Sequence, residues 1–254
     1  MSRPGTCIAM VSGAPTSTVL VGAVMCFFLN GLSFLAVIVS LYLIKATFLP
    51  AKTTESVAAG IKSGFSFVRE RGALWQLTVL GFVSTFCGIP LLTQLPVIAS
   101  KTFGLNAKGY SYMLATSGVG SIIGALIYAG LSQRKRQGLL ALRVQLMFAV
   151  LLGTFALSKY LPLSYLCLFF GGMCLITLFA CVTSLVQMVV TEEVRGRVMS
   201  IFMLAFRGGM PLGNLASGWF AYHYSPARAL FVLSCVLAAT ALGFLVSSSG
   251  IKEL

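Results

Sequence analysis

The chain has 254 residues, of which 58% are hydrophobic and only 9% are charged, and its mean hydropathy is +0.96. Soluble domains carry about a quarter charged residues, so this composition excludes a water-soluble globule. The chain contains eighteen Lys and Arg, five Glu and no Asp. It therefore has few of the carboxylates that carboxylate-dyad hydrolases, Ser/His/Asp triads and hard-metal sites need. The Lys and Arg residues lie between apolar stretches instead of clustering on one polar face, so nucleic acid is not expected as a partner.

Apolar stretches long enough to cross a bilayer as helices recur along the chain, each with the roughly twenty residues that a span needs. Seven such stretches lie near 18–44, 74–99, 110–131, 139–158, 163–189, 199–222 and 228–248. Residues 1–17 remain an unassigned segment, and only Arg3 precedes the first stretch, which is too long for a secretory signal. The sequence predicts an all-α polytopic membrane protein with about seven transmembrane helices and the lipid bilayer as a partner.

The distribution of Lys and Arg predicts the orientation, because short cytoplasmic loops are enriched in these residues. One set of loops holds twelve bases and the alternate set holds five, with Arg207 left inside a span. This split predicts an external amino terminus, a cytoplasmic carboxyl terminus and a location in the cell (inner) membrane. Anionic lipid headgroups are the natural partner of the excess positive charge.

The segment between the first two spans, residues 45–73, has the pattern of an amphipathic helix on the cytoplasmic membrane surface. Thr54 can cap a helix, and apolar residues follow it at helical spacing. These apolar residues are Val57, Ile61, Phe65 and Val68. The alternative is an ordinary solvated connection.

Polar residues inside spans are costly and therefore mark candidate sites. Arg207 lies roughly 12 Å into the sixth span, and Asn214 and Gly218 follow on the same helix face. We interpret this stripe as a cavity wall that contacts an anionic or polar group of a substrate. Alternatively, Arg207 snorkels to the headgroups or bonds the carbonyls of a neighbouring helix.

The second span contains a second candidate, because Thr93 and Gln94 stand between Pro90 and Pro96. Each proline frees a backbone carbonyl and bends the helix, and such a broken segment suits a gate or a substrate site. A bend that serves helix packing alone is the alternative.

Small residues predict where helices approach closely in lipid. Gly120 and Gly124 stand four residues apart in the third span, as Gly209 and Gly213 do in the sixth. Two such tracts three helices apart are the pattern of a three-plus-three internal repeat. Spans two to seven would then form two triplets.

Cysteines and serines offer two further possibilities. Cys167, Cys174 and Cys181 share one helix face, but without His or a CxxC pair they indicate a helix contact, so no metal and no cofactor are expected. Ser117 and Ser121 do not form the Gly-x-Ser-x-Gly turn of a serine nucleophile, so we expect no enzyme. An intramembrane hydrolase is kept as an alternative.

Two stretches carry a family resemblance. Residues 192–200 (EEVRGRVMS) and 205–213 (AFRGGMPLG) resemble the loop before the eleventh helix, and that helix itself, in the major facilitator superfamily. More narrowly they resemble bacterial drug, macrolide and siderophore exporters related to the enterobactin exporter. Residues 28–37 (FLNGLSFLAV) resemble the sixth helix of that group. The resemblance implies a conformational or packing role for the matched residues Arg195, Gly196, Arg197, Gly208, Gly209, Pro211 and Gly213.

The resemblance implies that residues 18–44 are helix six, that 45–73 link two halves, and that 74–254 are the carboxyl-terminal six-helix bundle. It also implies efflux of a small amphiphilic compound such as a drug or siderophore, by proton-coupled antiport around a midplane site. The loop at 131–136 departs from the family's cytoplasmic motif, since Gln133 stands in place of an acid.

The first five helices of such an exporter have no counterpart in this chain, which leaves two interpretations. The chain is a half that pairs with a separate amino-terminal half, or it is a truncated remnant without transport of its own. Every Glu lies in a predicted loop or tail. In a proton-coupled exporter, the titrating carboxylate is therefore expected from the missing helices.

Overall fold

The computed structural model describes residues 16–43, 65–66, 68–131, 137–190 and 194–247, in two compact units, residues 1–54 and 55–254. In the first unit the chain forms helix α2 (Thr16–Leu43). Its described side chains are exposed, including Phe27, Leu35 and Tyr42. The predicted amphipathic linker lies mostly outside the described residues, although Phe65, Ser66 and residues 68–70 are helical.

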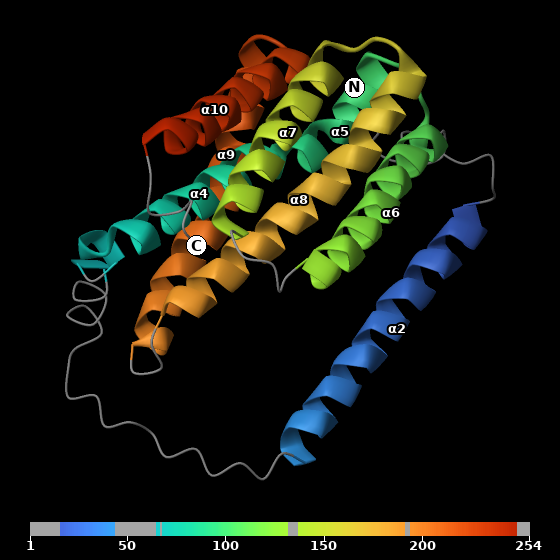
Figure 1. Ribbon diagram of the computed structural model, residues 1–254. Coiled ribbons are helices and arrows are strands. Elements are labelled where there is room, and N and C mark those ends of the chain that lie inside the picture. Colours follow the sequence, from blue (N-terminus) through green and yellow to red (C-terminus); the bar gives the residue numbers. More distant parts are fainter. Residues whose placement is uncertain (1–15, 44–64, 67, 132–136, 191–193, 248–254) are drawn as a thin grey trace. The chain divides into compact units, whose positions relative to one another are not determined.

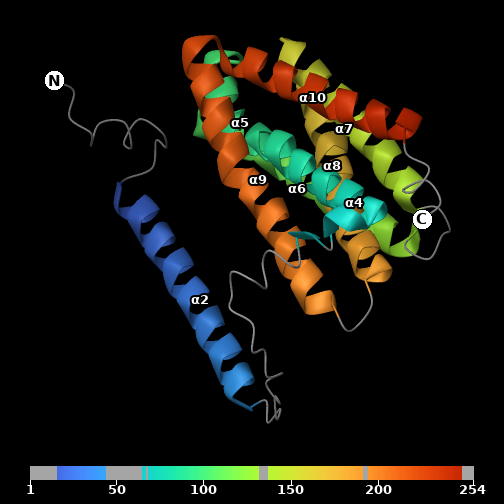
Figure 2. The same cartoon turned by 90° about the vertical axis from the view of Figure 1, so that its left-hand side faces the viewer.

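The second unit is a helical bundle, and no strand occurs in the residues described (Figures 1 and 2). Six of its segments are long and apolar enough to cross a membrane, with α4 and α5 together forming one of them, and α2 contributes a shorter apolar stretch. The predicted all-α polytopic membrane fold is therefore confirmed. The helices are α4 (Gly72–Gly88), α5 (Pro90–Lys101), α6 (Ala107–Leu131), α7 (Gln137–Leu157), α8 (Leu161–Val189), α9 (Arg195–His223) and α10 (Pro226–Ser247).

The first span of the bundle is broken into α4 and α5 at the first of its two prolines. Pro90 has no N–H, so the carbonyl of Phe86, four residues earlier, loses its helical donor. The α4 helix accordingly ends at Gly88 and α5 begins at Pro90, while Pro96 lies inside α5.

The helices pair in a crossed pattern, with α4 packed on α9, α6 on α8, and α7 on α10. The first helix of each triplet therefore packs on the second helix of the other triplet, and the third helices pack on each other. Figure 1 shows α6 and α8 side by side along most of their length. The helix α7 also packs on α8, its neighbour in the chain, as extensively as on α10. The crossed pairing is compatible with a three-plus-three repeat.

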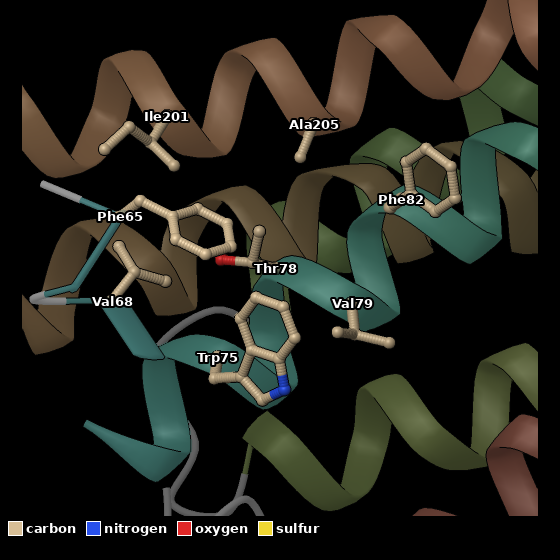
Figure 3. A pocket seen from close by; sticks show the side chains of 8 residues that line it. All are labelled: Phe65, Val68, Trp75, Thr78, Val79, Phe82, Ile201 and Ala205. Carbon is tan, nitrogen blue, oxygen red and sulfur yellow. The ribbon is translucent and has the colours of Figure 1, made fainter. Parts of the chain in front are cut away.

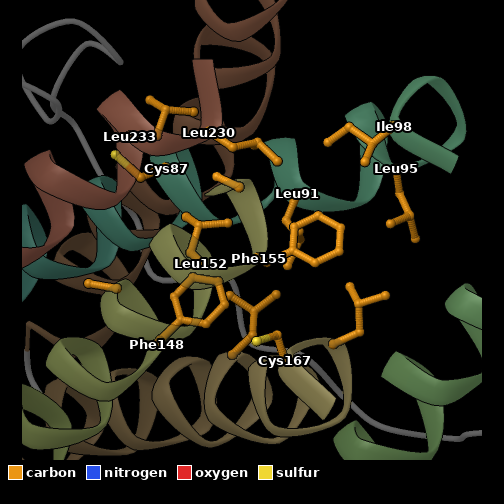
Figure 4. Close-up of a cluster of buried hydrophobic side chains, with 14 of the residues drawn as sticks. Cys87, Leu91, Leu95, Ile98, Phe148, Leu152, Phe155, Cys167, Leu230 and Leu233 are labelled. Carbon is orange, nitrogen blue, oxygen red and sulfur yellow. The ribbon is translucent and has the colours of Figure 1, made fainter. Parts of the chain in front are cut away.

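Two clusters of buried apolar side chains form the core. One joins α5, α7, α8 and α10 around Leu91, Phe148 and Leu230 (Figure 4). The other joins α4, α8 and α9 around Leu77 and Phe202. The most apolar windows of the α4–α5 and α8 spans are each 56% buried, against 28% for α6 and 22% for α9. The α7 span, at 50%, is nearly as buried as these two first helices, while α6 and α9 have the smallest buried shares of the six spans.

Candidate functional site

Glycines bring α6 and α8 into backbone contact. A Cβ on Gly120 would overlap the carbonyl oxygen of Phe169, and a Cβ on Gly124 would overlap that of Met173. Residues without a side chain are therefore required for this approach, as is common between membrane helices. We call this contact the α6–α8 seam.

The same arrangement recurs between α4 and α9, in what we call the α4–α9 seam. Gly209 lies against the carbonyl oxygen of Phe82, and Gly213 lies against that of Phe86. The Phe86 oxygen is the one that Pro90 deprives of its helical donor. A Cα hydrogen of Gly213 faces this oxygen, a geometry in which a weak hydrogen bond compensates part of the loss.

Other residues of the predicted packing motif lie outside the seam. A Cβ on Gly208 would meet no atom within 4 Å, and Pro211 is exposed. Arg195, Gly196 and Arg197 form the exposed first turn of α9, which begins four residues before the predicted span. The conformational role of these residues stays a prediction.

Arg207 lies on the side of α9 that faces away from α4. At 100° per residue, Arg207, Asn214 and Gly218 are turned by about 140–180° from Gly209, which marks the seam. The Arg207 side chain is exposed and Asn214 is half-buried. The predicted stripe therefore forms part of the outer surface of this bundle.

The structure joins two candidate residues that sequence reasoning had placed in different spans. The Thr93 hydroxyl of α5 lies 3.0 Å from Asn214 Oδ1 of α9, as a donor, and 3.2 Å from the carbonyl oxygen of Pro90. Thr93 is exposed, whereas the neighbouring Gln94 is buried, at 8% exposure. Thr93 and Asn214 thus share one surface, and Gln94 belongs to a different side of α5.

Gln145 is a polar residue that sequence reasoning missed. Its side chain is fully buried in α7, and Nε2 donates to Thr240 Oγ1 at 2.9 Å and to the carbonyl of Leu237 at 3.2 Å. Ser84 of α4 donates to its Oε1 at 3.4 Å. Gln145 thus connects three helices, and its signal in the sequence was a lone amide within the apolar stretch 139–158.

Two apolar grooves follow the α4–α9 seam. The first has a volume of 230 Å³ and lies where both helices begin (Figure 3), and the second, of 600 Å³, lies farther along α9. Neither groove includes the Thr93–Asn214 surface. The first groove is lined by Phe65, Val68, Trp75, Thr78, Val79, Phe82, Ile201 and Ala205. The second groove is lined by Phe86, Leu212, Leu215, Ala216, Trp219 and Phe220.

The three cysteines of α8, and Ser117 and Ser121 of α6, lie in helix contacts. Cys167, Cys174 and Cys181 are buried, and no group of three His, Cys, Asp or Glu in the described part of the chain could hold a metal ion. Ser121 donates to the carbonyls of Ser117 on its own helix and Gly172 on α8. These contacts describe packing, and they give no geometry for a nucleophile.

An all-helical membrane bundle made of two crossed triplets, with polar side chains on an outer helix, has the architecture of a secondary transporter. The sequence profile of the transmembrane secretion effectors matches residues 9–251. The chain therefore belongs to this family of major facilitator exporters, which indicates a role as a membrane transporter. No curated protein and no solved structure matches the chain.

Proposed function

We propose that the chain acts as the carboxyl-terminal half of an exporter for a small amphiphilic compound, such as a drug or siderophore. In this proposal Arg207, Asn214 and Thr93 form its share of the substrate cavity. The observation that supports the proposal is the hydrogen bond between Thr93 and Asn214, which creates a polar surface between two apolar spans. Such polar surfaces in membrane proteins usually face a cavity or a partner.

The position of Arg207 favours a ligand with an anionic group. Arg207 is twelve residues from the start of α9 and sixteen from its end, which places it roughly 18 Å along the helix. A guanidinium facing hydrocarbon at this depth is costly, whereas one that faces a wet cavity can pair with a carboxylate or phosphate. Thr93 and Asn214 would then receive neutral polar groups of the same compound.

A second helical half is the proposed partner for this surface. The Arg207 side of α9 faces away from α4 and is exposed, so a facing bundle would enclose it without disturbing either glycine seam. For proton-driven antiport, that other half would also supply the carboxylate that titrates at bilayer depth. Arg207 cannot do so, because a guanidinium stays protonated at every relevant pH.

Export measurements with a matched amino-terminal half test the proposal. In cells that express both halves, Arg207→Ala should lower export severalfold at near-normal abundance, while Arg228→Ala, at the start of α10, should leave export unchanged. Thr93→Val and Asn214→Ala should each reduce export. The double variant should reduce export by a smaller factor than the product of the two single reductions. Collapse of Arg207→Ala abundance with rescue by Arg207→Lys would make Arg207 a packing residue.

Proteoliposomes separate the half-transporter from a remnant. The chain alone should show no substrate-dependent proton flux under a pH gradient, and addition of the amino-terminal half should produce it. A lack of flux with every amino-terminal half of the family would favour a remnant. Robust flux with the chain alone would contradict both the half-transporter and the external carboxylate.

We also propose an inner-membrane orientation with a cytoplasmic carboxyl terminus, on the strength of the charge distribution. Single cysteines in place of Asn106 and Lys159 should react with an impermeant thiol reagent from outside, and one in place of Arg195 from inside. All three positions are exposed, whereas Gln137, in a loop of the cytoplasmic set, is buried and unsuitable. Labelling of Asn106 and Arg195 positions from the same side would contradict the topology, because three spans separate them.

A further inference from the structure

The first groove combines an apolar interior with an opening at one end of the bundle. Its lining side chains with a polar atom are Trp75 and Thr78, and the Thr78 hydroxyl donates to the carbonyl of Leu74 on its own helix at 2.8 Å. The side chains of Ile201 and Ala205 on α9 point toward Phe65 and Thr78 (Figure 3). The groove therefore offers a ligand only hydrocarbon contacts, of the kind that an alkyl chain makes.

Arginines stand directly beyond this groove on both of its helices. Arg71, at the amino end of α4, is one turn before Trp75, and Arg197 of α9 is one turn before Ile201. Residues four apart share a helix face, and side chains lean toward the start of their helix. Arg197 therefore lies on the face of α9 that forms the groove, and Arg71, the extended N-cap of α4, lies in the chain between the lining residues Val68 and Trp75. Both arginine side chains are exposed. Arg69 and Arg195 are also exposed at this end, where the described acid is Glu70, whose carboxylate accepts a hydrogen bond from Ser66 at 2.8 Å.

We propose that the first groove is a binding site for an anionic glycerophospholipid. One acyl chain occupies the groove, and the phosphate is bound by Arg71 and Arg197. Arginine suits this task because its planar donors match phosphate oxygens, and each basic residue near a membrane surface strengthens attraction to anionic lipid. A zwitterionic lipid presents the same chains but carries a cation that offsets the attraction.

The second groove shows that this combination is not general along the seam. It is equally apolar, but its α9 end is followed by Ala221, Tyr222, His223 and Tyr224, with no arginine one turn beyond the lining. His223 Nδ1 lies 3.0 Å from the carbonyl oxygen of Trp219 on its own helix. The second groove is therefore a natural control, with apolar lining and no Arg pair.

The two tryptophans of the chain report on the two grooves separately. Trp75 lines the first groove and Trp219 lines the second, and the chain has no other tryptophan. Trp219→Phe and Trp75→Phe thus give full-length proteins with one reporter each. Each variant is reconstituted in phosphatidylcholine vesicles with a minor fraction of phosphatidylglycerol, and bromine, which quenches tryptophan fluorescence, is placed on the acyl chains of one lipid at a time.

Brominated phosphatidylglycerol should quench Trp75 well beyond its mole fraction, and quench Trp219 in proportion to its mole fraction. Replacement of Arg71 and Arg197 by Gln should lower the relative affinity at Trp75 by about fivefold for each arginine. The matched control Arg143→Gln with Arg228→Gln should leave it unchanged. High salt should weaken the preference in the protein with all its arginines, a readout that needs no Arg variant to fold.

Two results would overturn the proposal. Quenching of Trp75 that follows mole fraction for both lipids would make the groove an ordinary lipid-facing surface. Protection of Trp75 from both brominated lipids would mean that protein covers the groove, either a second copy or another helical half. In each case Trp219, measured in the Trp75→Phe variant, should still be quenched.

Discussion

The α6–α8 and α4–α9 seams use the same device, a glycine pair four residues apart against two backbone carbonyls, but they are reinforced differently. Across the α6–α8 seam, Ser121 Oγ donates to the carbonyl of Gly172 at 3.2 Å, and Thr177 Oγ1 lies 3.2 Å from the carbonyl of Gly124. Hydroxyls next to the glycines thus reach across the seam, although each lies closer to a carbonyl of its own helix, Ser121 to that of Ser117 at 2.9 Å and Thr177 to that of Met173 at 2.7 Å.

The hydroxyls of α4 are directed elsewhere. Thr85 and Thr78 bond carbonyls of their own helix, and Ser84 bonds its own helix and Gln145 on α7. The bond to α9 comes from Thr93 on α5, beyond the proline break. The comparison teaches that glycines permit close approach while neighbouring hydroxyls decide how firmly a seam is held.

Adding a single methyl group to a seam glycine should have the largest effect. Gly120→Ala should lower stability by about 3 kcal/mol, because the new Cβ meets a fixed backbone carbonyl of α8. Gly209→Ala should cost less, about 2 kcal/mol, because the backbone carbonyl of Phe82 lies farther from the new Cβ than that of Phe169 does in Gly120→Ala, and Thr85 can change its χ1 rotamer. Unfolding of the purified protein in detergent and denaturant measures both.

Glycines outside the seams provide the matched controls. Gly118→Ala and Gly208→Ala add the same methyl group where no atom lies within 4 Å, so stability should hold or rise by about 0.5–1 kcal/mol through helix propensity. Equal losses at the seam and control positions would show that the glycines do not mark the contacts.

Removing the Gln145 amide should lower the stability of the bundle by an intermediate amount, because it removes the hydrogen bonds that connect α7 to α4 and α10. Gln145→Met keeps the shape but loses the bonds to Thr240, Leu237 and Ser84, at a cost of about 1–2 kcal/mol. Gln187→Met, at an exposed position of α8, is the control and should be neutral. Thermal unfolding followed by circular dichroism measures the difference, and an unchanged Gln145 variant would argue against the three-helix link.

Deleting the cross-seam hydroxyls should have the smallest effect. Thr177→Val and Ser121→Ala should each cost about 0.6 kcal/mol, the typical value of a hydrogen bond between membrane helices. Thr116→Val, whose hydroxyl bonds only its own helix at 2.8 Å in the described structure, should cost less. Hydrogen exchange of α6 amides should rise in the first two variants and not in the third. An equal rise of hydrogen exchange in all three variants would contradict the proposed difference between the two seams.

The sequence predicts the spans well because hydrophobic length is a local property. Each predicted span of the bundle corresponds to a helix within a few residues, and the break at Pro90 follows from a missing N–H. The start of α9 at Arg195 was harder to place, because a polar, charged first turn gives no hydrophobic signal.

The candidate site was predictable only residue by residue. Thr93 and Asn214 stood out as polar groups in apolar spans, but their bond joins positions 121 residues apart, which no local pattern encodes. Gln94 carried the same signal as Thr93, and only the helix rotation in the bundle separates the buried side chain from the exposed one. Gln145 has partners on two other helices, so its role depends on packing that the sequence does not display.

The depth of Arg207 has a consequence for the response to membrane voltage. Three spans of the bundle run one way and three run the other, so their helix dipoles largely cancel. Among the described cations, Arg207 lies farthest from any helix end, and it is therefore the charge best placed to feel the field. Moving one charge across the whole membrane is worth about 2.3 kcal/mol per 100 mV. In the proposed antiport cycle, an anionic substrate would cancel this charge on the outward step, which leaves the proton-loaded return as the voltage-dependent step.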